Sequence, residues 1–228
     1  LITKDLTLIG EAGTIIQAPA SGRQTYTLAE SSKTWDPIIL AYGGTMSGSH
    51  ISGAGTIDVE IIGLELNGGN TGVNGVRYAG ILGRNMNGLI DGNYVHDMWG
   101  AVATGPETMG IIVMGDSTIT ISDNTVEDFS RGGITANGDG SSAPDPDAII
   151  EGNTVYGYDE GSATGYWADN GIQIGWGASG VVRYNTVQDC AVTNLHWSAS
   201  GILVYDAVDE IYGNTVDNCD LGIAAYYV

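Results

Sequence analysis

Short runs in which apolar and polar residues alternate recur along the chain, separated by Gly, Asn and Asp. Alternation with period two is typical of strands that bury one face, and the 3.6-residue spacing of an amphipathic helix is missing. Five segments share the pattern apolar-x-x-Asn-x-Val, with their asparagines at positions 93, 124, 153, 185 and 214. The steps between them are 31, 29, 32 and 29 residues, so the sequence predicts a repeat of about thirty residues.

A second signal follows each copy, a Gly-Ile pair that opens another alternating run. These pairs are Gly80-Ile81, Gly110-Ile111, Gly133-Ile134, Gly171-Ile172, Gly201-Ile202 and Gly222-Ile223. We interpret these glycines, and those just before the asparagines, as positions where the chain bends. An earlier, degenerate copy has Leu64 where the Asn would be. Each repeat therefore holds two or three short strands, and such a unit buries its apolar side only by stacking on its neighbours.

The Asn column favours a solenoid over other repeat folds. Equivalent positions in neighbouring coils of a solenoid stack about 4.8 Å apart, so an inward Asn can bridge to the next Asn and to the backbone of the bend. A propeller blade needs four strands in roughly forty residues, which is longer than this unit. The Ile three residues before each Asn and the Val two residues after it point the same way, into the predicted core.

The I-x-x-N-x-V and G-I-x-V pattern resembles the right-handed parallel β-helix repeat family (PbH1-type). The resemblance covers roughly residues 57 to 228, and the segment from Leu6 to Ile16 looks like the first coil of that family. It implies an all-β fold, a single-stranded right-handed parallel β-helix over residues 1–228, with about seven coils of roughly 20 to 38 residues. The fold hosts polysaccharide lyases, polygalacturonases, epimerases, phage tailspikes and surface proteins without known catalysis, so it does not decide the function.

The two cysteines of the chain, Cys190 and Cys219, both stand five residues after an Asn, in adjacent coils. A separation of about 4.8 Å lies in the Cα range that a disulfide accepts, whereas strands in parallel register often hold the Cβ vectors poorly aligned for one. Two interpretations are therefore open, a disulfide and a pair of buried thiols that pack as small apolar residues.

Three long connections, residues 96–109, 156–170 and 188–200, are expected to leave the same side of the stack. They carry aromatic residues and acids, which suit a carbohydrate site because sugar C–H faces stack on rings while hydroxyls bond to carboxylates. The alternative is that the rings pack within their own loops. Carbohydrate-binding candidates are Trp99, Tyr166, Trp167 and Trp197. Catalytic candidates are Asp159, Asp169, His196 and Arg183, although Arg183 could equally form a surface ion pair with Glu151.

A further insertion carries Asp139, Asp145 and Asp147 among glycine and proline residues. Three carboxylates could hold Ca²⁺, but the spacing is not that of an EF-hand, and a plain acidic loop is the alternative. Asp97 and Asp128 stand four residues after successive asparagines, where they form either a like-charge pair relieved by a cation or two solvated turn residues. The fold requires no cofactor, and Ca²⁺ is the one that the sequence suggests.

Charge and motifs narrow the function. The chain has 27 Asp and Glu against 7 Lys and Arg, a net charge of −20, which argues against a nucleic-acid partner. The longest apolar runs are too short for membrane insertion. From the resemblance, a polygalacturonase would be expected to carry N-T-D, D-D and G-H-G motifs, and an alginate epimerase the motif Asp-Pro-His-Glu. The sequence has none of these motifs. The acidity would also repel anionic polysaccharides unless Ca²⁺ intervened.

Two functional hypotheses follow. The first is an extracellular or cell-surface protein with a structural or adhesive role, whose partners are carbohydrate or copies of itself, assembled end to end or side by side. Strand-like sequence at both ends motivates it, since this suggests part of a longer chain or a stacking unit. The second is a polysaccharide-active enzyme, a lyase, epimerase or glycoside hydrolase, with its site in the aromatic and acidic loops.

Overall fold

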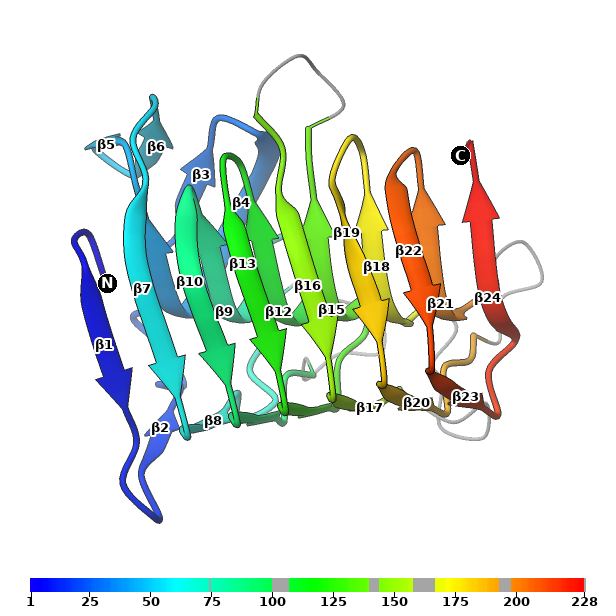
Figure 1. The fold of residues 1–228 in the computed structure, drawn as a ribbon. Helices are drawn as coiled ribbons and strands as arrows, with labels where there is room; N and C mark the ends of the chain where they lie inside the picture. Colours follow the sequence, from blue (N-terminus) through cyan, green and yellow to red (C-terminus); the bar gives the residue numbers. More distant parts are fainter. Residues whose placement is uncertain (74, 100–106, 140–143, 158–166, 193–197, 228) are drawn as a thin grey trace.

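The computed structural model describes residues 1–73, 75–99, 107–139, 144–157, 167–192 and 198–227. It confirms the predicted architecture, because short strands recur in the same order in successive coils and pair in parallel with the coil before and the coil after (Figure 1). Within these residues two sheets have seven strands each and the third has ten. No helix in the described part of the chain is long and apolar enough to cross a membrane.

Each coil gives one strand to each of the three sheets, and the N-terminal region adds β3, β5 and β6 to the third sheet. In order, the first sheet consists of β1 (Leu6–Ile9), β7 (Ile57–Ile62), β10 (Met86–Asp91), β13 (Thr118–Ser122), β16 (Asp147–Glu151), β19 (Ser179–Arg183) and β22 (Val208–Tyr212). The second sheet consists of β2 (Ile15–Gln17), β8 (Glu65–Asn67), β11 (Tyr94–His96), β14 (Thr125–Glu127), β17 (Thr154–Tyr156), β20 (Thr186–Gln188) and β23 (Thr215–Asp217). The third sheet consists of β5 (Thr45–Ser47), β6 (His50–Ser52), β3 (Tyr26–Leu28), β4 (Ser31–Tyr42), β9 (Arg77–Arg84), β12 (Thr108–Met114), β15 (Gly132–Asn137), β18 (Asn170–Gly175), β21 (Ser200–Tyr205) and β24 (Leu221–Tyr226).

The predicted asparagine ladder runs along the bend between the first and second sheets. Nδ2 of Asn124 donates to Oδ1 of Asn153 at 3.0 Å and to the carbonyl oxygen of Ile90 at 2.9 Å. The backbone N–H of Asn124 donates to the same Oδ1 at 3.0 Å. The pattern continues from Asn93 to Asn214. The ladder therefore satisfies backbone groups that the bend would otherwise bury unpaired.

Two columns of glycine have different causes. The residue before each ladder Asn has a left-handed backbone, with φ of 61° at Gly92 and 68° at Gly152, which confirms a bend there. The predicted bend at the Gly-Ile pairs is wrong. Those glycines lie inside the strands of the third sheet and are not left-handed, and an added Cβ at Gly80 would lie 2.5 Å from Cγ1 of Val95. They are small because the second sheet packs directly against them.

The predicted interior columns are buried. At three residues before and two residues after the ladder Asn, the side chains of the central coils are fully enclosed: Ile90, Ile121, Ile150 and Val182, and Val95, Val126, Val155 and Val187. Five residues after the ladder Asn, the side chains of Met98, Phe129 and Cys190 also lie in this core. Tyr158, at the same position in its coil, lies outside the described residues. The long connections 96–109, 156–170 and 188–200 all lead from the second sheet to the third, as predicted.

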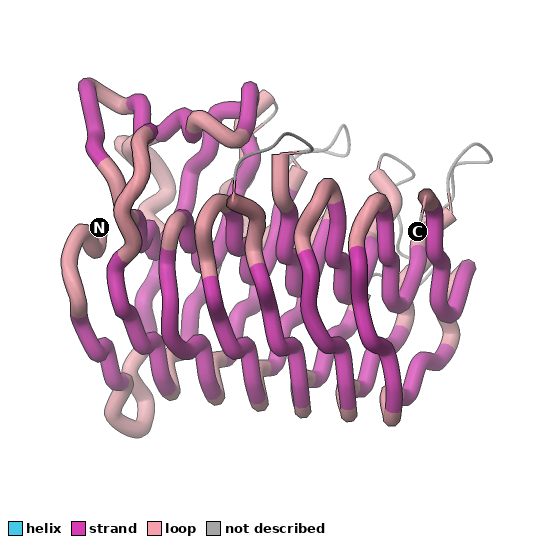
Figure 2. Tube along the Cα trace, turned by 45° about the horizontal axis from the view of Figure 1, so that its top comes forward, coloured by secondary structure: helices cyan, strands magenta, loops and turns pink. Residues whose placement is uncertain are grey.

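One element has no counterpart in the sequence predictions. Residues 26–34 and 44–56, which we call the flap, form a small sheet of β3, the start of β4, β5 and β6. Figure 2 shows chain standing out from the row of coils at the N-terminal end of the solenoid. Leu28 and Ile51 of the flap pack on the outer face of the third sheet, against Leu82 and Ile112, and form a second hydrophobic core. The outer face over β4, β9 and β12 is therefore covered.

Candidate ligand-binding groove

One outward-facing register position of the third sheet changes character along the stack. In paired order it holds Leu40, Leu82, Ile112, Thr135, Gln173, Leu203 and Ala224. The first three lie beneath the flap in the second core. Thr135 and Gln173 are polar, and both line hollows beside the flap. The change from apolar to polar side chains marks the point where the covered face ends.

Two hollows lie on this face next to one another. The first, of about 230 Å³, is lined by Glu30, Ser31 and Lys33 from the flap and by residues of β9, β12, β15 and β18. The second, of about 590 Å³, is lined mainly by residues of β18, β21 and β24. Both are lined by Arg131, Gln173 and Trp176, so we treat them as one outer groove. The larger hollow has the size of an ordinary small-ligand site.

A chain of buried amides forms part of the groove floor. The backbone N–H of Ser200 donates to Oδ1 of Asn170 at 3.1 Å, and Nδ2 of Asn170 donates to Oε1 of Gln173 at 3.2 Å. Nε2 of Gln173 then donates to Oδ1 of Asn137 at 2.9 Å. These three side chains are between 3% and 6% exposed. The chain fixes their orientation, and each amide retains capacity for a further hydrogen bond.

Aromatic rings stand beside the amides. The rings of Trp176 and Tyr205 lie 5.1 Å apart with a tilt of 38°, and Tyr205 meets Tyr227 edge-on at 5.4 Å. Trp176 follows β18 in a left-handed conformation with φ of 53°, and its backbone N–H donates to the carbonyl of Tyr205 at 2.8 Å. This turn places an indole at the groove, where a ring supplies an apolar surface with a polar edge.

Charges balance at the flap end of the groove. Nε of Arg77 lies 2.6 Å from Oε2 of Glu107, and Nζ of Lys33 lies 3.9 Å from Oε1 of the same carboxylate. Arg131 donates to the carbonyl of Ala168 at 3.3 Å. Burial lowers the pKa of Arg131, Glu107 opposes that shift, and Arg77 adds to it. Three cations line the first hollow in a chain that has only 7 Lys and Arg, so the net charge of −20 does not describe this surface.

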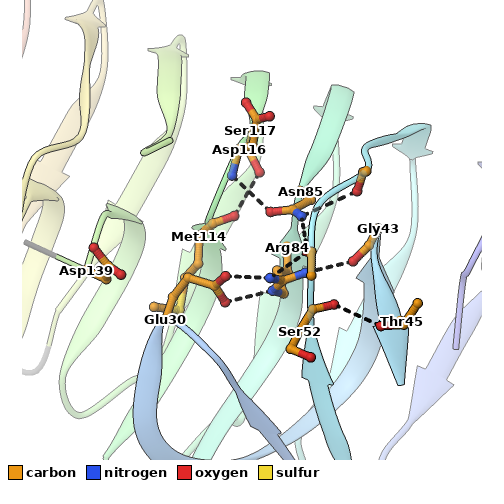
Figure 3. A network of polar contacts seen from close by, with 12 residues as sticks. Glu30, Gly43, Thr45, Ser52, Arg84, Asn85, Met114, Asp116, Ser117 and Asp139 are labelled. Carbon is orange, nitrogen blue, oxygen red and sulfur yellow. Dashed lines mark hydrogen bonds and ion pairs between the residues drawn. The ribbon is translucent and has the colours of Figure 1, made fainter. Parts of the chain in front are cut away.

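A buried ion pair fixes the flap (Figure 3). The guanidinium of Arg84, which is 2% exposed, contacts both carboxylate oxygens of Glu30, at 2.5 and 2.7 Å. It also donates to the carbonyls of Gly43 at 2.8 Å and Gly53 at 3.1 Å. A charge-assisted pair in two-pronged geometry is the strongest kind of side-chain hydrogen bond. Arg84 therefore ties two parts of the flap to the coil that carries β9.

Comparison with known families decides the classification. The model of the right-handed beta helix region matches residues 38–165, more than half of the chain. The protein belongs to this right-handed β-helix family. Searches of curated proteins and of solved structures return no match. The family agrees with the predicted fold and leaves the function of this β-helix to its own side chains.

The aromatic residues predicted to bind sugar are distributed unevenly in the β-helix. Trp167 is half-buried, and the guanidinium of Arg131, a residue that lines the groove, lies 5.7 Å from the centre of its ring. Trp99 is half-buried in another connection, where its carbonyl accepts from the N–H of Gly72. Tyr166 and Trp197 lie outside the described residues.

The catalytic candidates of the β-helix are not brought together where they are described. Asp169 is 2% exposed and directly precedes β18 in the third sheet. Arg183 belongs to the first sheet, where it pairs with Glu151 at 2.5 Å and donates to the hydroxyl of Tyr212 at 3.0 Å. The alternative of a surface ion pair therefore describes Arg183. Asp159 and His196 lie outside the described residues.

The proposed calcium ligands also separate. The backbone N–H of Asp139 donates to Oδ1 of Asp145 at 3.2 Å, so these two residues are neighbours. Burial raises the pKa of Asp145. Asp147 instead begins β16 and accepts from the hydroxyl of Ser179 at 3.3 Å. In the described ranges no three His, Cys, Asp or Glu side chains form a group that could hold a metal ion.

Asp97 and Asp128 are turn residues of the β-helix. Both have left-handed backbones, with φ of 53° and 57°, and Asp189 and Asn218 repeat this conformation in later coils. Asp and Asn are the residues other than Gly that adopt it most easily, which explains the column.

Both cysteines of the β-helix are free thiols in adjacent coils, with Cys190 buried and Cys219 partly exposed. Contact with Cys219 and burial raise the pKa of Cys190, whereas that same contact lowers the pKa of Cys219. The disulfide is a prediction that this geometry leaves open.

The groove residues Gln173, Trp176 and Tyr205 were not predicted from the sequence. A partial signal was available, because Tyr205 recurs as Tyr226 in the next coil, whereas Gln173 is followed there by the apolar Leu203. The long connections hold more aromatic and acidic residues, and the sequence therefore favours the loops over the outward side of these strands.

Proposed function

We propose that this β-helix is a carbohydrate-binding protein that acts outside the cell or at its surface, in a structural or adhesive role. The observation that carries the proposal is the outer groove, in which the amides of Asn137, Asn170 and Gln173 lie beside the rings of Trp176 and Tyr205. Fixed amides can hydrogen-bond sugar hydroxyls, while rings receive the apolar faces of the sugar.

The charge of the groove supports binding rather than catalysis. Of the two carboxylates that line the first hollow, Glu30 is held by Arg84 at 2.5 Å, and Asp139 is the other; Glu107, beside the hollow, is held by Arg77 at 2.6 Å. A general acid or base needs a carboxyl free to exchange a proton with the substrate. Paired acids instead leave a locally balanced surface that a neutral glycan approaches without repulsion.

The test is a glycan array followed by calorimetric titration of the best neutral oligosaccharide. We expect Trp176→Ala and Gln173→Met each to weaken binding by about tenfold or more, since a few central groups carry most of the binding energy. Tyr184→Ala is the matched control, because Tyr184 is 62% exposed and stands at the end of β19, away from the groove.

Two outcomes contradict the proposal. One is that no glycan binds, and the other is that binding survives both groove variants. Release of unsaturated or reducing ends from the bound glycan would instead favour the polysaccharide-active enzyme.

A further inference from the structure

The flap ends the outer groove on one side. Leu82 and Ile112 belong to the hydrophobic core beneath the flap residues Leu28 and Ile51. Thr135 and Gln173 occupy the same outward register position in the next two coils and line the first hollow. At this register position Thr135 is the first residue that lines the groove, and Met109 and Met114 of β12 line the same hollow beside it. A chain lying along the groove therefore meets a wall of protein at this point.

Flap residues form that wall. Glu30, Ser31 and Lys33, from the turn into β4, line the first hollow together with Arg77 and Thr135. The side chain of Lys33 is 51% exposed and reaches toward Glu107 at 3.9 Å. Oγ1 of Thr135 is buried and has no hydrogen-bond partner in the described part of the chain, so the closed end contains a polar group that a bound hydroxyl could satisfy.

The wall is fixed to the solenoid. Arg84 holds Glu30 and the carbonyls of Gly43 and Gly53, and Nδ2 of Asn85 donates to the carbonyls of Gly53 at 3.2 Å and Gly55 at 3.3 Å. Opening the flap would break this buried ion pair and expose the hydrophobic core beneath it, and both changes are unfavourable. These contacts tie the flap to the coil that carries β9, so we treat the closed end as a fixed part of the groove.

We infer that the groove recognises the end of a glycan chain, with the terminal sugar against the flap and the following sugars along β18 and β21. This rests on the proposed function, since it specifies how the same groove holds its carbohydrate. A closed end admits a terminal sugar and excludes a continuous chain, whereas a groove open at both ends would accept internal segments equally well.

Stoichiometry tests the inference directly. The neutral polysaccharide that gives the best signal on the array is prepared as short, intermediate and long fractions, and each is titrated with the intact protein by calorimetry and sedimentation. We expect the number of protein molecules bound per polysaccharide chain to stay constant at every length, because a chain has one end of the matching kind. A number that rises with chain length would overturn the inference and leave the proposed function standing. Absence of binding to every fraction would overturn both.

Two variants test whether the terminal sugar binds against the flap. We expect Lys33→Ala and Thr135→Val each to weaken binding of the short fraction by about tenfold. The Thr135→Val protein should unfold at the same or a higher temperature, because the hydroxyl that it loses is buried without a partner. The matched control is Lys4→Ala, since Lys4 is the other lysine of the chain and is exposed before β1. Unchanged affinity in both variants would overturn the assignment of the terminal sugar to the flap.

Discussion

Gly133 of the third sheet and Val155 of the second are in such close contact that no side chain fits between them. A Cβ atom at Gly133 would lie 2.5 Å from Cγ1 of Val155 and 2.5 Å from the carbonyl oxygen of Gly171. We predict that Gly133→Ala lowers the free energy of unfolding by about 1–3 kcal/mol, the usual cost of overpacking a core. Urea unfolding measures it.

Gly222→Ala is the matched control for this prediction. Gly222 has the same place in its Gly-Ile pair, but an added Cβ there meets no atom within 4 Å. The control should unfold like the parent protein. Equal losses in the two variants would mean that the backbone conformation of these strands, and not contact with the Val column, requires glycine at these positions.

Substitution of an Asn at the centre of the ladder should lower the free energy of unfolding more than substitution of an Asn at its end. Asn153→Ala removes the acceptor of two donors on Asn124 and the donor to the carbonyl of Ile121, all inside the core. Each buried group left unpaired costs roughly 1–3 kcal/mol, so we predict a loss of about 3 kcal/mol or more. Asn214→Ala should cost less, because Asn214 is only half-buried and water can replace it. Chemical denaturation of both variants gives the comparison, and equal costs would contradict the ladder as a buried network.

The parts of the fold that sequence could predict are those that repeat. The Asn and Val represented by Asn153 and Val155 recur every 29 to 32 residues in five successive coils, so one local pattern specifies a contact with the next copy of itself. The flap does not recur. Leu28 and Ile51 bury their side chains in one core with Leu82 and Ile112, which lie far away in the sequence. No repeat in the sequence predicts that contact.

The groove could not be predicted from the sequence for a related reason. Gln173 and Thr135 look like ordinary outward positions of an alternating strand. They share a register position with Leu82, but they line a hollow, whereas Leu82 is packed in the core beneath the flap. The sequence also presents the glycines of the Gly-Ile pairs as bends, because glycine is common in turns. Their true cause, a valine across the core, is a tertiary contact.

The cysteine pair should form a bond between coils under mild oxidation. Cys190 and Cys219 share a column in neighbouring coils, and the contact between them lowers the pKa of Cys219. We predict that diamide removes both titratable thiols without forming dimers and raises the melting temperature, because a crosslink restricts the unfolded chain. In Cys190→Ser the remaining thiol should stay titratable. Two thiols that persist after oxidation would favour the alternative of two free, packed cysteines.

A carboxylate at the left-handed turn should make stability depend on pH. Burial, followed by the neighbouring charge of Glu127, raises the pKa of Asp128 above its ordinary value of 3.8. Since the folded-state pKa exceeds the unfolded one, protonated Asp128 stabilises the fold below that ordinary value, and this contribution is lost as the pH rises through the raised pKa. At neutral pH the charged side chain therefore costs stability.

We predict that Asp128→Asn raises the free energy of unfolding at pH 7 by up to about 1 kcal/mol, because Asn keeps the left-handed conformation and removes the charge. The gain should disappear below the ordinary pKa of 3.8, where both side chains are neutral. Asp189→Asn is the matched control, since Asp189 has φ of 60° in the same column but already accepts from Nδ2 of Asn218 at 2.6 Å. Urea unfolding of the three proteins across acidic and neutral pH tests this, and a gain that stays constant with pH would show that the backbone, and not the charge, is what Asn improves.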